Sequence, residues 1–448
     1  MKKSFYSALL SISLLSFTGY SQQTPAPTQT FQELMDLGVV QSRQGNYPLA
    51  QNYFTQAIQL QPDNAVAYYI RGVTKSNLKD NRGAINDFDK AIELNPRYSD
   101  AYIGRGTSKA RQEDHKGALQ DYNRGIDLNP VDANAYFSRG YSKSKLENYK
   151  GALSDYNKSL DLTPDNALGY AARGVVKQKL EDYKGSLEDF SKAIELSPKR
   201  PSSYSGRAYS KMKMADYKGA IADYGKALEI SPEDAESLYY RGYCKSQTED
   251  FAGAQIDFDR ALSQDPENAP AYYGRGFAKN KLGRTKEAID DFNKAIAIGN
   301  IEAKKVLYAG PITKQVLDEL RSGVSERLKM AEMTAERSEV YYNRGLSKAK
   351  IGDTKSAIED YNKAIALNPT FAEAYFTRGM VKSQIGDQRG AIQDCTNALK
   401  LNSKYAEAYY VRGIIRHALG DTDGCNDLSK AGELGYTAAY AVIRDYCN

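Results

Sequence analysis

A motif of 34 residues, repeated along most of the chain, constrains the fold more than any other sequence feature. Its clearest copy spans residues 133–166 and reads ANAYFSRGYSKSKLENYKGALSDYNKSLDLTPDN. Proline marks the period, recurring every 34 residues at Pro62, Pro96, Pro130, Pro164, Pro198, Pro232 and Pro266. Units of this kind stack into one continuous core, so the length of 448 residues sets the number of units rather than the number of domains.

Each copy of the motif predicts a helical hairpin. Apolar and small residues follow helical spacing twice within one period, and a polar turn such as residues 147–149 separates the two stretches. The proline ends the second helix because it cannot continue the hydrogen-bond ladder. Helix-forming Ala, Lys, Glu, Leu and Arg recur throughout, so the sequence predicts an all-α chain.

The period and its motif resemble the tetratricopeptide-repeat (TPR) family, whose signature is W-x2-L-G-x2-Y, then A-x3-F, then P. The second copy matches this signature at Tyr68, Arg71-Gly72, Lys75, Ala84, Phe88 and Pro96. Two departures are regular: the signature Leu is Arg, and the signature Tyr is Lys. The resemblance covers nearly all of residues 31–448 and implies a right-handed α-solenoid of about eleven repeats.

The repeats are expected to form two arrays. Residues 31–309 predict eight repeats closed by a cap helix, and residues 338–448 predict three repeats with a second cap helix. Both caps follow a repeat that lacks its proline, and a solenoid needs such caps to cover its last apolar face.

Residues 310–337 predict an amphipathic connector helix between the arrays. Apolar residues from Leu317 to Ala331 recur at spacings of three and four, which is typical of one helix face. This face is expected to pack on one or both arrays. An interaction helix for a partner is the less favoured alternative, because such stripes usually bury within their own chain.

The first 21 residues predict a signal peptide. Lys2 and Lys3 precede a short apolar stretch over residues 5–15, and Gly19-Tyr20-Ser21 provides small residues for cleavage. Residues 22–30 then predict a flexible lead-in. No later segment is apolar enough to span a membrane, so the mature chain is expected to be soluble in the periplasm or outside the cell.

The overall charge argues against a general nucleic-acid or anionic-membrane binder. The formal net charge is +5, and removal of Lys2 and Lys3 with the leader leaves +3. No run of five like charges appears in the sequence.

A charged pattern recurs at positions 7, 11 and 23 of the repeat, counted from Ala133 as position 1. In the repeat 133–166 these residues are Arg139, Lys143 and Asp155. Positions 7 and 23 lie at the same level on antiparallel helices, so the pattern predicts a partly buried structural ion pair in each repeat. The alternative is a cationic stripe for an anionic ligand, which the matching aspartates make less favoured.

Aromatic residues recur at positions 4, 5 and 9. Those at position 4 are expected in the core, by analogy with the Trp of the family. In the family, positions 5 and 9 tend to face the concave groove that binds partner segments, so the resemblance implies a partner-binding groove lined by aromatic side chains. These residues, called the groove rings below, are Tyr69, Phe137, Tyr141, Tyr209, Tyr239, Tyr243, Tyr273, Phe277, Tyr342, Phe376 and Tyr410. An equally favoured alternative is that the rings fill gaps between adjacent repeats.

The four cysteines divide into two pairs. Cys244 and Cys395 occupy core positions and predict buried free thiols. Cys425 and Cys447 lie on either side of the turn at Gly435, at similar distances along antiparallel helices, so they predict a disulfide in an oxidising compartment.

No motif for catalysis appears in the sequence. His115 and His417 are the two histidines and lie in unrelated repeats, and there is no phosphate loop, zinc-ligand cluster or nucleophile motif. The chain is therefore expected to be a scaffold without enzymatic activity, cofactor or metal, which binds segments of other proteins in the cell envelope. The alternative is a glycan- or cell-wall-binding protein that uses the same tyrosine-rich surface.

Overall fold

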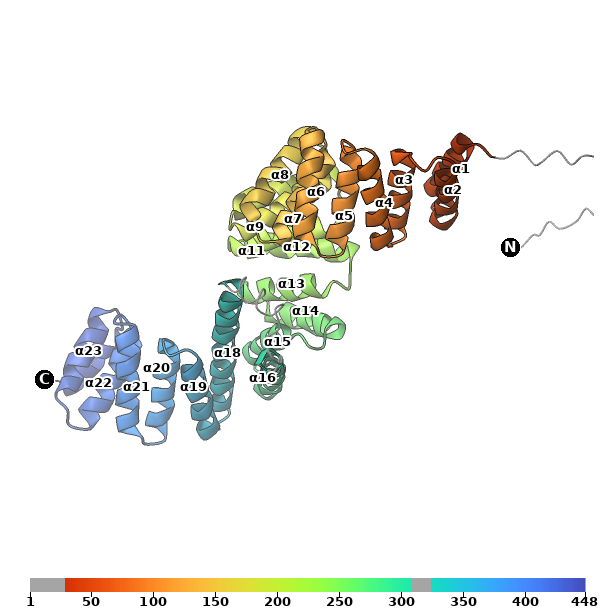
Figure 1. Ribbon diagram of the computed structural model, residues 1–448. Helices are drawn as coiled ribbons and strands as arrows, with labels where there is room; N and C mark the ends of the chain where they lie inside the picture. Colours follow the sequence, from red (N-terminus) through yellow and green to blue (C-terminus); the bar gives the residue numbers. More distant parts are fainter. Residues whose placement is uncertain (1–28, 308–323, 448) are drawn as a thin grey trace, which may run out of the picture. The chain divides into compact units, whose positions relative to one another are not determined.

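The computed structural model describes the backbone of residues 29–307 and 324–447 (Figure 1). Side chains are described for residues 29–299 and 337–447. Over these ranges the chain consists of helices and contains no strand, and consecutive helices pair into hairpins. The predicted signal peptide, all but the last two residues of the lead-in and the first half of the connector lie outside the described residues.

The chain divides into two compact units, with the boundary between Thr163 and Pro164. The described part of the first unit holds four hairpins. Their helices are α1 (Phe31–Arg43), α2 (Tyr47–Leu60), α3 (Ala65–Asn77), α4 (Asn81–Leu94), α5 (Ser99–Arg111), α6 (His115–Leu128), α7 (Ala133–Lys145) and α8 (Tyr149–Leu162).

The second unit continues with the same type of hairpin. Its described helices before residue 308 are α9 (Ala167–Lys179), α10 (Tyr183–Leu196), α11 (Pro201–Lys213), α12 (Tyr217–Ile230), α13 (Ala235–Gln247), α14 (Phe251–Gln264), α15 (Ala269–Lys281) and α16 (Thr285–Leu307). Those after residue 323 are α18 (Val324–Lys350), α19 (Thr354–Leu367), α20 (Ala372–Gln384), α21 (Gln388–Leu401), α22 (Ala406–Ala418), α23 (Asp423–Glu433) and α24 (Ala438–Tyr446).

Polar caps start most of the second helices. In the repeat 133–166, Asn148 Oδ1 accepts a hydrogen bond from the backbone N–H of Gly151 at 3.0 Å. Asp114 and Asp182 cap α6 and α10 in the same way. Such a cap satisfies a backbone donor at the helix start and contributes about 1 kcal/mol.

The turn inside each hairpin needs one residue with a left-handed backbone. Glycine fills this place in the first repeat, in the eighth and in those after residue 323, at Gly45, Gly283, Gly352, Gly386 and Gly420. In the six repeats between, the same place holds Lys79, Glu113, Glu147, Glu181, Ala215 and Glu249, with φ between 59° and 63°. Side chains rarely adopt this conformation, so these six turns carry backbone strain.

Small residues let the two helices of a hairpin approach closely. Ala135 and Ala152 are fully buried in the repeat 133–166. A Cβ atom added to Gly140 would lie 3.1 Å from the ring of Tyr156. The glycine at position 8 and the alanine at position 20 therefore have a packing role.

The cap helix expected after the eighth repeat is not a separate helix. Helix α16 runs without a break through Gly299 to Leu307. A glycine inside a helix costs only about 1 kcal/mol relative to alanine, so it does not by itself end the helix. Sequence reasoning placed a break there because the repeat proline is missing.

Helix α18 joins two predicted elements, since it begins within the expected connector and continues into the first repeat after residue 337. Val340 of α18 packs in one apolar cluster with Ala288, Phe292 and Ala295 of α16. Arg344 Nη1 donates to Asn293 Oδ1 at 2.8 Å. These described contacts stack the repeat that begins at residue 338 on the repeat that contains α16.

No helix among the described residues is long and apolar enough to cross a membrane.

Candidate functional site

The charged pattern of the repeat forms a three-residue cluster, here called the charged frame. In the repeat 133–166, Arg139 Nη2 and Nε donate to Asp155 Oδ1 and Oδ2 at 2.7 and 2.9 Å. Lys143 Nζ lies 2.8 Å from Asp155 Oδ2. Asp155 is only 3% exposed. Both carboxylate oxygens of Asp155 thus have a cationic partner within the same hairpin, as expected for a structural ion pair.

The same frame recurs along both units. Its Arg–Asp pairs are Arg71–Asp87, Arg105–Asp121, Arg139–Asp155, Arg173–Asp189, Arg207–Asp223, Arg241–Asp257, Arg275–Asp291, Arg344–Asp360, Arg378–Asp394 and Arg412–Asp427. This repetition fits a structural role, because each arginine already has its own carboxylate.

The remaining arm of the arginine often reaches the preceding repeat, which sequence reasoning did not specify. Arg139 Nη1 donates to Asn123 Oδ1 at 2.8 Å, and Arg275 Nη1 donates to Asp259 Oδ1 at 2.7 Å. The partner occupies position 25 of the preceding repeat. The frame therefore connects adjacent repeats as well as the two helices of one repeat.

The tyrosines at position 4 were expected in the core, and the structure corrects this. Tyr136 is half-buried, and the guanidinium carbon of Arg139 lies over its ring, 5.4 Å from the ring centroid. The signature Leu of the family has become this arginine, so the ring packs under a cation instead of an aliphatic side chain.

Electrostatics within the frame favour the ionised carboxylate. Burial alone would raise the pKa of Asp223, but hydrogen bonds and charge from Arg207 and Lys211 outweigh it and hold the pKa below its ordinary value. The hydrogen bond to Asp223 in turn raises the pKa of Arg207. The pair stays charged near neutral pH.

Most groove rings at position 5 lie half-buried against other rings. Within their own repeats, Tyr69, Phe137 and Tyr342 lie 5.9, 5.5 and 6.0 Å from Phe88, Tyr156 and Tyr361. Phe376 and Tyr410 lie 4.8 and 4.6 Å from Tyr405 and Tyr436. At these places the geometry favours the gap-filling alternative.

The groove rings at position 9 are more accessible. Tyr141 is 46% exposed and Tyr243 is 38% exposed, while Tyr209 and Phe277 are half-buried. An aromatic residue at the start of the preceding second helix packs edge-on against some of them, as Phe251 does against Phe277 at 6.2 Å. Lys145 and Lys281 lie over the rings of Tyr141 and Phe277.

Four groove rings converge on one hollow in the second unit, here called the Tyr243 cavity. They are Tyr239 and Tyr243 of α13 and Tyr273 and Phe277 of α15. The cavity has a volume of 570 Å³, and Val340, Glu339 and Arg337 of α18 line its other side. The remaining groove rings lie outside it: Tyr69, Phe137, Tyr141, Tyr209, Tyr342, Phe376 and Tyr410.

Polar groups border the Tyr243 cavity where α18 meets α15. Asn343 Nδ2 donates to Tyr273 Oη at 2.9 Å, and Tyr273 Oη donates to Glu339 Oε2 at 3.4 Å. Burial and the neighbouring Tyr217 raise the pKa of Tyr243, so its hydroxyl remains a hydrogen-bond donor. The cavity thus combines an aromatic wall with a few oriented polar groups, as ligand sites commonly do.

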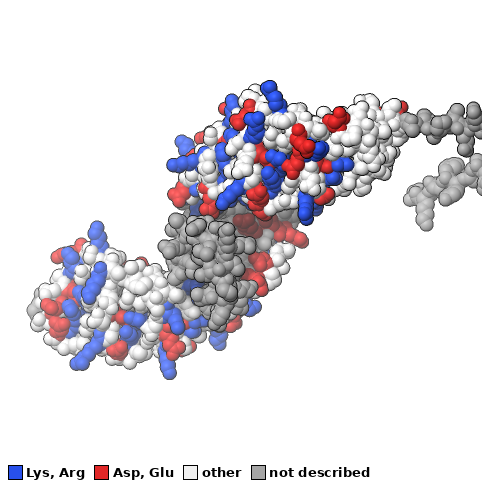
Figure 2. Space-filling model, in the orientation of Figure 1, with Lys and Arg blue, Asp and Glu red and all other residues white. Residues whose placement is uncertain are grey.

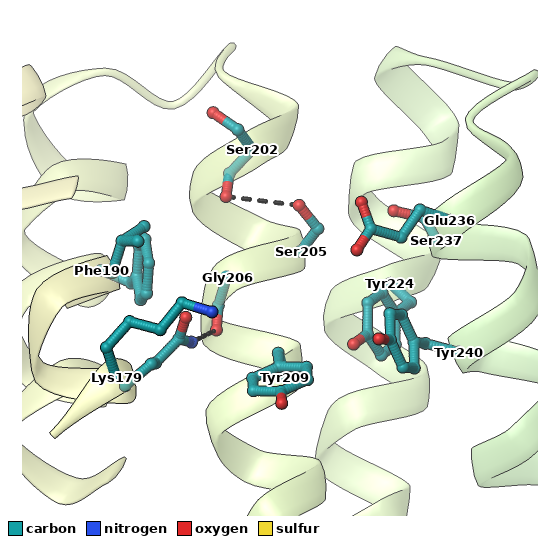
Figure 3. Close-up of a pocket in the computed structure, with 12 residues that line it drawn as sticks. Lys179, Phe190, Ser202, Ser205, Gly206, Tyr209, Tyr224, Glu236, Ser237 and Tyr240 are labelled. Atoms are coloured by element: carbon teal, nitrogen blue, oxygen red, sulfur yellow. Dashed lines mark hydrogen bonds between the residues drawn. The ribbon is translucent and has the colours of Figure 1, made fainter. Parts of the chain in front are cut away.

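A second hollow, the Ser205 cavity, was missed by sequence reasoning (Figure 3). It has a volume of 370 Å³ and is lined from three consecutive repeats, by residues that include Gln178, Ser205, Tyr224 and Ser237. The signal in the sequence was the loss of the position-5 ring in two consecutive repeats, at Ala171 and Ser205.

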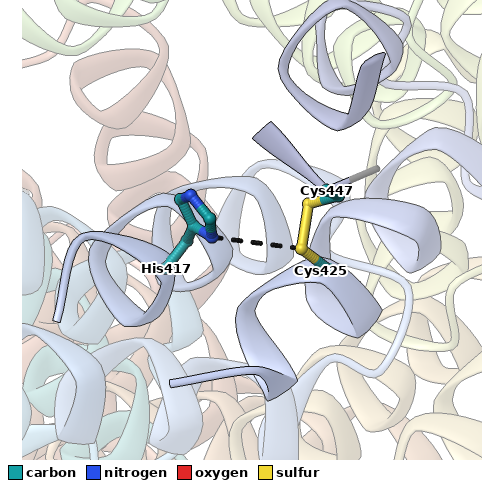
Figure 4. Close-up of side chains that lie close together, drawn as sticks. All are labelled: His417, Cys425 and Cys447. Carbon is teal, nitrogen blue, oxygen red and sulfur yellow. Dashed lines mark hydrogen bonds between the residues drawn. A yellow bond between two sulfur atoms is a disulfide. The ribbon is translucent and has the colours of Figure 1, made fainter. Parts of the chain in front are cut away.

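The cysteines occupy two kinds of environment. Burial raises the pKa of both Cys244 and Cys395 to about 12, which keeps these thiols unreactive. Cys425 and Cys447 lie side by side, with Cα atoms 5.7 Å apart, a usual spacing for a disulfide pair. His417 Nδ1 lies 4.0 Å from Cys425 Sγ (Figure 4). Joined as a disulfide, the two sulfurs would not be thiolates and would not offer a metal its usual ligands.

Charges of both signs are interspersed over the described surface in Figure 2. Lys and Arg alternate with Asp and Glu on the face shown, without a large field of one sign. This distribution agrees with the small net charge and gives no support to a nucleic-acid interface.

Comparison with known structures reveals several TPR folds with low sequence identity. YrrB, a TPR protein described as having an unusual peptide-binding site, is 21% identical over 41% of this chain and 95% of its own, with a TM-score of 0.38. PilF of Pseudomonas aeruginosa is 19% identical over 46% and 94%, with a TM-score of 0.43. A TPR protein of Parabacteroides merdae is 21% identical over 58% and 98%, with a TM-score of 0.42.

Family models give the direct assignment. No curated protein matches the chain by sequence. Models described as tetratricopeptide repeat match more than half of the chain, at residues 35–74, 77–133, 103–167, 167–200, 201–234, 245–300, 338–371 and 360–393. The fold and the repeat motif agree with these matches, and the chain belongs to the tetratricopeptide-repeat family.

Proposed function

We propose that the protein is a non-catalytic scaffold that binds extended segments of partner proteins. The binding groove is formed by the first helix of each repeat. TPR repeats in general form protein–protein interaction scaffolds. The observation that carries the proposal is the Tyr243 cavity, where four groove rings from two consecutive repeats line one hollow. Aromatic rings supply large rigid contact area, and their hydroxyls add directed hydrogen bonds.

The chemistry of the Tyr243 cavity indicates what kind of anchor it takes. Its wall holds the aromatic faces of Tyr239, Tyr273 and Phe277, together with Ala295 and Val340. An apolar side chain of the partner would bury against these groups. Arg337 and Glu339 at the edge would then bind polar groups of the flanking partner backbone. An apolar anchor surrounded by a polar rim is the usual arrangement of an interaction hot spot.

The test compares ring deletions at equivalent positions. Tyr243→Ala and Phe277→Ala remove two rings of the Tyr243 cavity, and Tyr141→Ala removes the exposed ring at the same repeat position in the first unit. Affinity purification from the native cell extract, with quantitative mass spectrometry, is expected to lose the same partners with both cavity variants and to retain them with Tyr141→Ala. Unchanged recovery of all partners by a variant that combines Tyr243→Ala and Phe277→Ala would reject the cavity as the binding site.

We also propose that the protein acts outside the cytoplasm, in the cell envelope. The support is the leader-like order of residues 1–21, together with the proximity of Cys425 and Cys447, since disulfides persist in oxidising compartments. Alkylation of protein isolated from the envelope, without prior reduction, should leave both cysteines unlabelled. Mass-spectrometric detection of two alkylated cysteines, or of an uncleaved N-terminus in a cytoplasmic fraction, would contradict this placement.

A further inference from the structure

The Ser205 cavity lies where a repeat lacks the position-5 ring that the two following repeats have. At position 5, Tyr239 and Tyr273 of the following two repeats lie 6.0 and 5.9 Å from Phe258 and Phe292. In the repeat 201–234 the same position holds Ser205, and the space opposite Tyr224 stays open as part of the cavity of 370 Å³. Position 5 also lacks a ring in the preceding repeat, at Ala171, so the hollow lies beside two consecutive repeats with a small side chain at this position.

Two buried hydroxyl groups line this cavity without a hydrogen-bond partner among the described residues. Tyr224 is 1% exposed and Ser237 is 0% exposed, and neither Tyr224 Oη nor Ser237 Oγ has a partner. Ser237 stands at position 3, where Ala67, Ala101, Ala135 and Ala271 are equally buried. Ser203 at the same position is also buried and unpartnered but does not line the cavity. Packing alone would therefore be satisfied by alanine, and a buried hydroxyl without a partner is unfavourable.

The rest of the lining is polar and aromatic. Ser205 Oγ donates to the carbonyl oxygen of Ser202 at 3.3 Å, and Gln178 Nε2 donates to the carbonyl oxygen of Gly206 at 2.7 Å. Figure 3 shows the rings of Tyr224 and Tyr240 side by side, with Tyr209 across from them. The Tyr224 and Tyr240 rings are stacked, with centroids 6.1 Å apart.

Two exposed charges of opposite sign, Lys179 and Glu236, also line the cavity. They do not favour a ligand of either net charge. An apolar anchor would leave the buried hydroxyls of Tyr224 and Ser237 without partners, which disfavours a purely apolar side chain. A neutral ligand whose groups both donate and accept hydrogen bonds fits the lining best, and aromatic faces suit the C–H faces of a sugar ring.

We propose that the Ser205 cavity binds a neutral saccharide unit. The hydroxyls of Tyr224 and Ser237 make hydrogen bonds to sugar hydroxyls, and Tyr209 and Tyr240 contact the ring. Gln178 and Glu236 provide further polar contacts at the edge. This site is separate from the Tyr243 cavity, so it adds a glycan specificity to the proposed protein scaffold and does not depend on it.

The test uses the full mature chain with glucose, N-acetylglucosamine and an N-acetylglucosamine trimer as probes, and glycerol as a simple polyol. Saturation-transfer NMR and isothermal titration calorimetry are expected to detect binding of at least one sugar but not of glycerol. Stronger binding of the trimer than of the monosaccharide would indicate that the natural ligand is a glycan chain. Equal binding of the two would indicate a free sugar.

Variants locate the binding in the cavity. Ser205→Tyr introduces the ring that the two following repeats carry and should abolish sugar binding. Ser237→Ala and Tyr224→Phe each remove one hydroxyl and should weaken binding roughly tenfold. Tyr361→Phe is the matched control, because Tyr361 Oη is also buried and unpartnered but its repeat keeps the position-5 ring of Tyr342. Circular dichroism confirms folding of each variant.

Two results would overturn the proposal. One is the absence of binding for every sugar at millimolar concentration, with only water in the cavity of a crystal soaked in the same probes. The other is sugar binding that Ser205→Tyr leaves unchanged while the variant remains folded. In either case, loss of partner proteins in Tyr243→Ala would still support the scaffold function. The saccharide proposal can therefore fail while the scaffold proposal holds.

Discussion

The repeats 133–166 and 201–234 have the same charged frame but differ in packing at position 5. Arg139–Asp155 and Arg207–Asp223 have the same closest distance of 2.7 Å. Phe137 packs on Tyr156 in the first repeat, whereas Ser205 leaves a cavity beside Tyr224 in the other. The charged frame and the position-5 side chain are therefore independent of each other. The position-5 residue, and the surface it shapes, can change from repeat to repeat while the frame stays the same.

Removing the frame carboxylate should cost the same in both repeats and give the largest effect. Asp155→Ala and Asp223→Ala each leave a partly buried arginine and lysine without their carboxylate, so each is expected to lower the unfolding free energy of its region by on the order of 3–5 kcal/mol. Native-state hydrogen exchange measures this locally. Asp161→Ala, an exposed aspartate on the same helix as Asp155, is the control and should have little effect. Similar losses for Asp155→Ala and Asp161→Ala would show that the frame is not structural.

Exchanging the ring should affect the two repeats in opposite directions. Phe137→Ser removes a half-buried ring and is expected to cost about 2 kcal/mol, less than the loss of a fully buried phenylalanine. Ser205→Phe fills an existing space and should leave the melting temperature unchanged or raise it. Thermal unfolding followed by circular dichroism tests the pair. A large loss of stability from Ser205→Phe would mean that the cavity cannot hold the ring that other repeats carry at this position.

Acid should weaken the frame of the repeat 201–234. Asp223 titrates at a lower pH in the folded chain than in the unfolded chain, so its ionised form stabilises the fold. This contribution is complete above the ordinary carboxyl pKa of about 3.9 and is lost as the pH falls through the lowered pKa. Urea unfolding between neutral and acidic pH should show it. Asp223→Asn is expected to reduce the pH dependence, and an identical acid profile would contradict the role of Asp223.

The smallest expected effect concerns the hairpin turns, where both repeats share the same strain. Glu147 and Ala215 have φ of 59° and 60°. Glu147→Gly and Ala215→Gly should each raise stability by about 0.5 kcal/mol, because relief of the left-handed strain exceeds the entropy cost of glycine. Chemical denaturation measures the gain. Glu147→Ala is the control that removes the charge but keeps the strain, and an equal gain from it would assign the effect to charge.

Much of the fold was predictable because the repeat encodes it locally. Helical spacing, turn residues and the proline after the second helix predict the hairpins, and the family comparison confirms the TPR fold. Positions 7 and 23 lie level in any antiparallel hairpin of this length, so the proximity of Arg139 and Asp155 follows from the sequence.

Features that depend on contact between repeats were harder to predict. The bond from Arg139 to Asn123 depends on the rotation of one repeat against the preceding one, which a single period does not encode. Whether a position-5 ring faces a groove or fills a gap depends on the ring opposite it, such as Tyr156 for Phe137. The continuous helix through Gly299 was also missed, because the missing proline looked like the end of an array.

The arginine of the charged frame gives the solenoid a direction. In most repeats its third arm is bound by the preceding repeat, as Arg139 is by Asn123, whereas Arg241 faces Gly225, which has no side chain to accept a hydrogen bond. The first repeat has no predecessor among the described helices, and there the chain places Leu37 at position 7 instead of arginine. The first repeat therefore has no position-7 arginine that would need a partner in a preceding repeat. Removing repeats from the C-terminal end would leave these bonds between repeats intact, whereas removing the repeat before Arg139 would leave its third arm without Asn123.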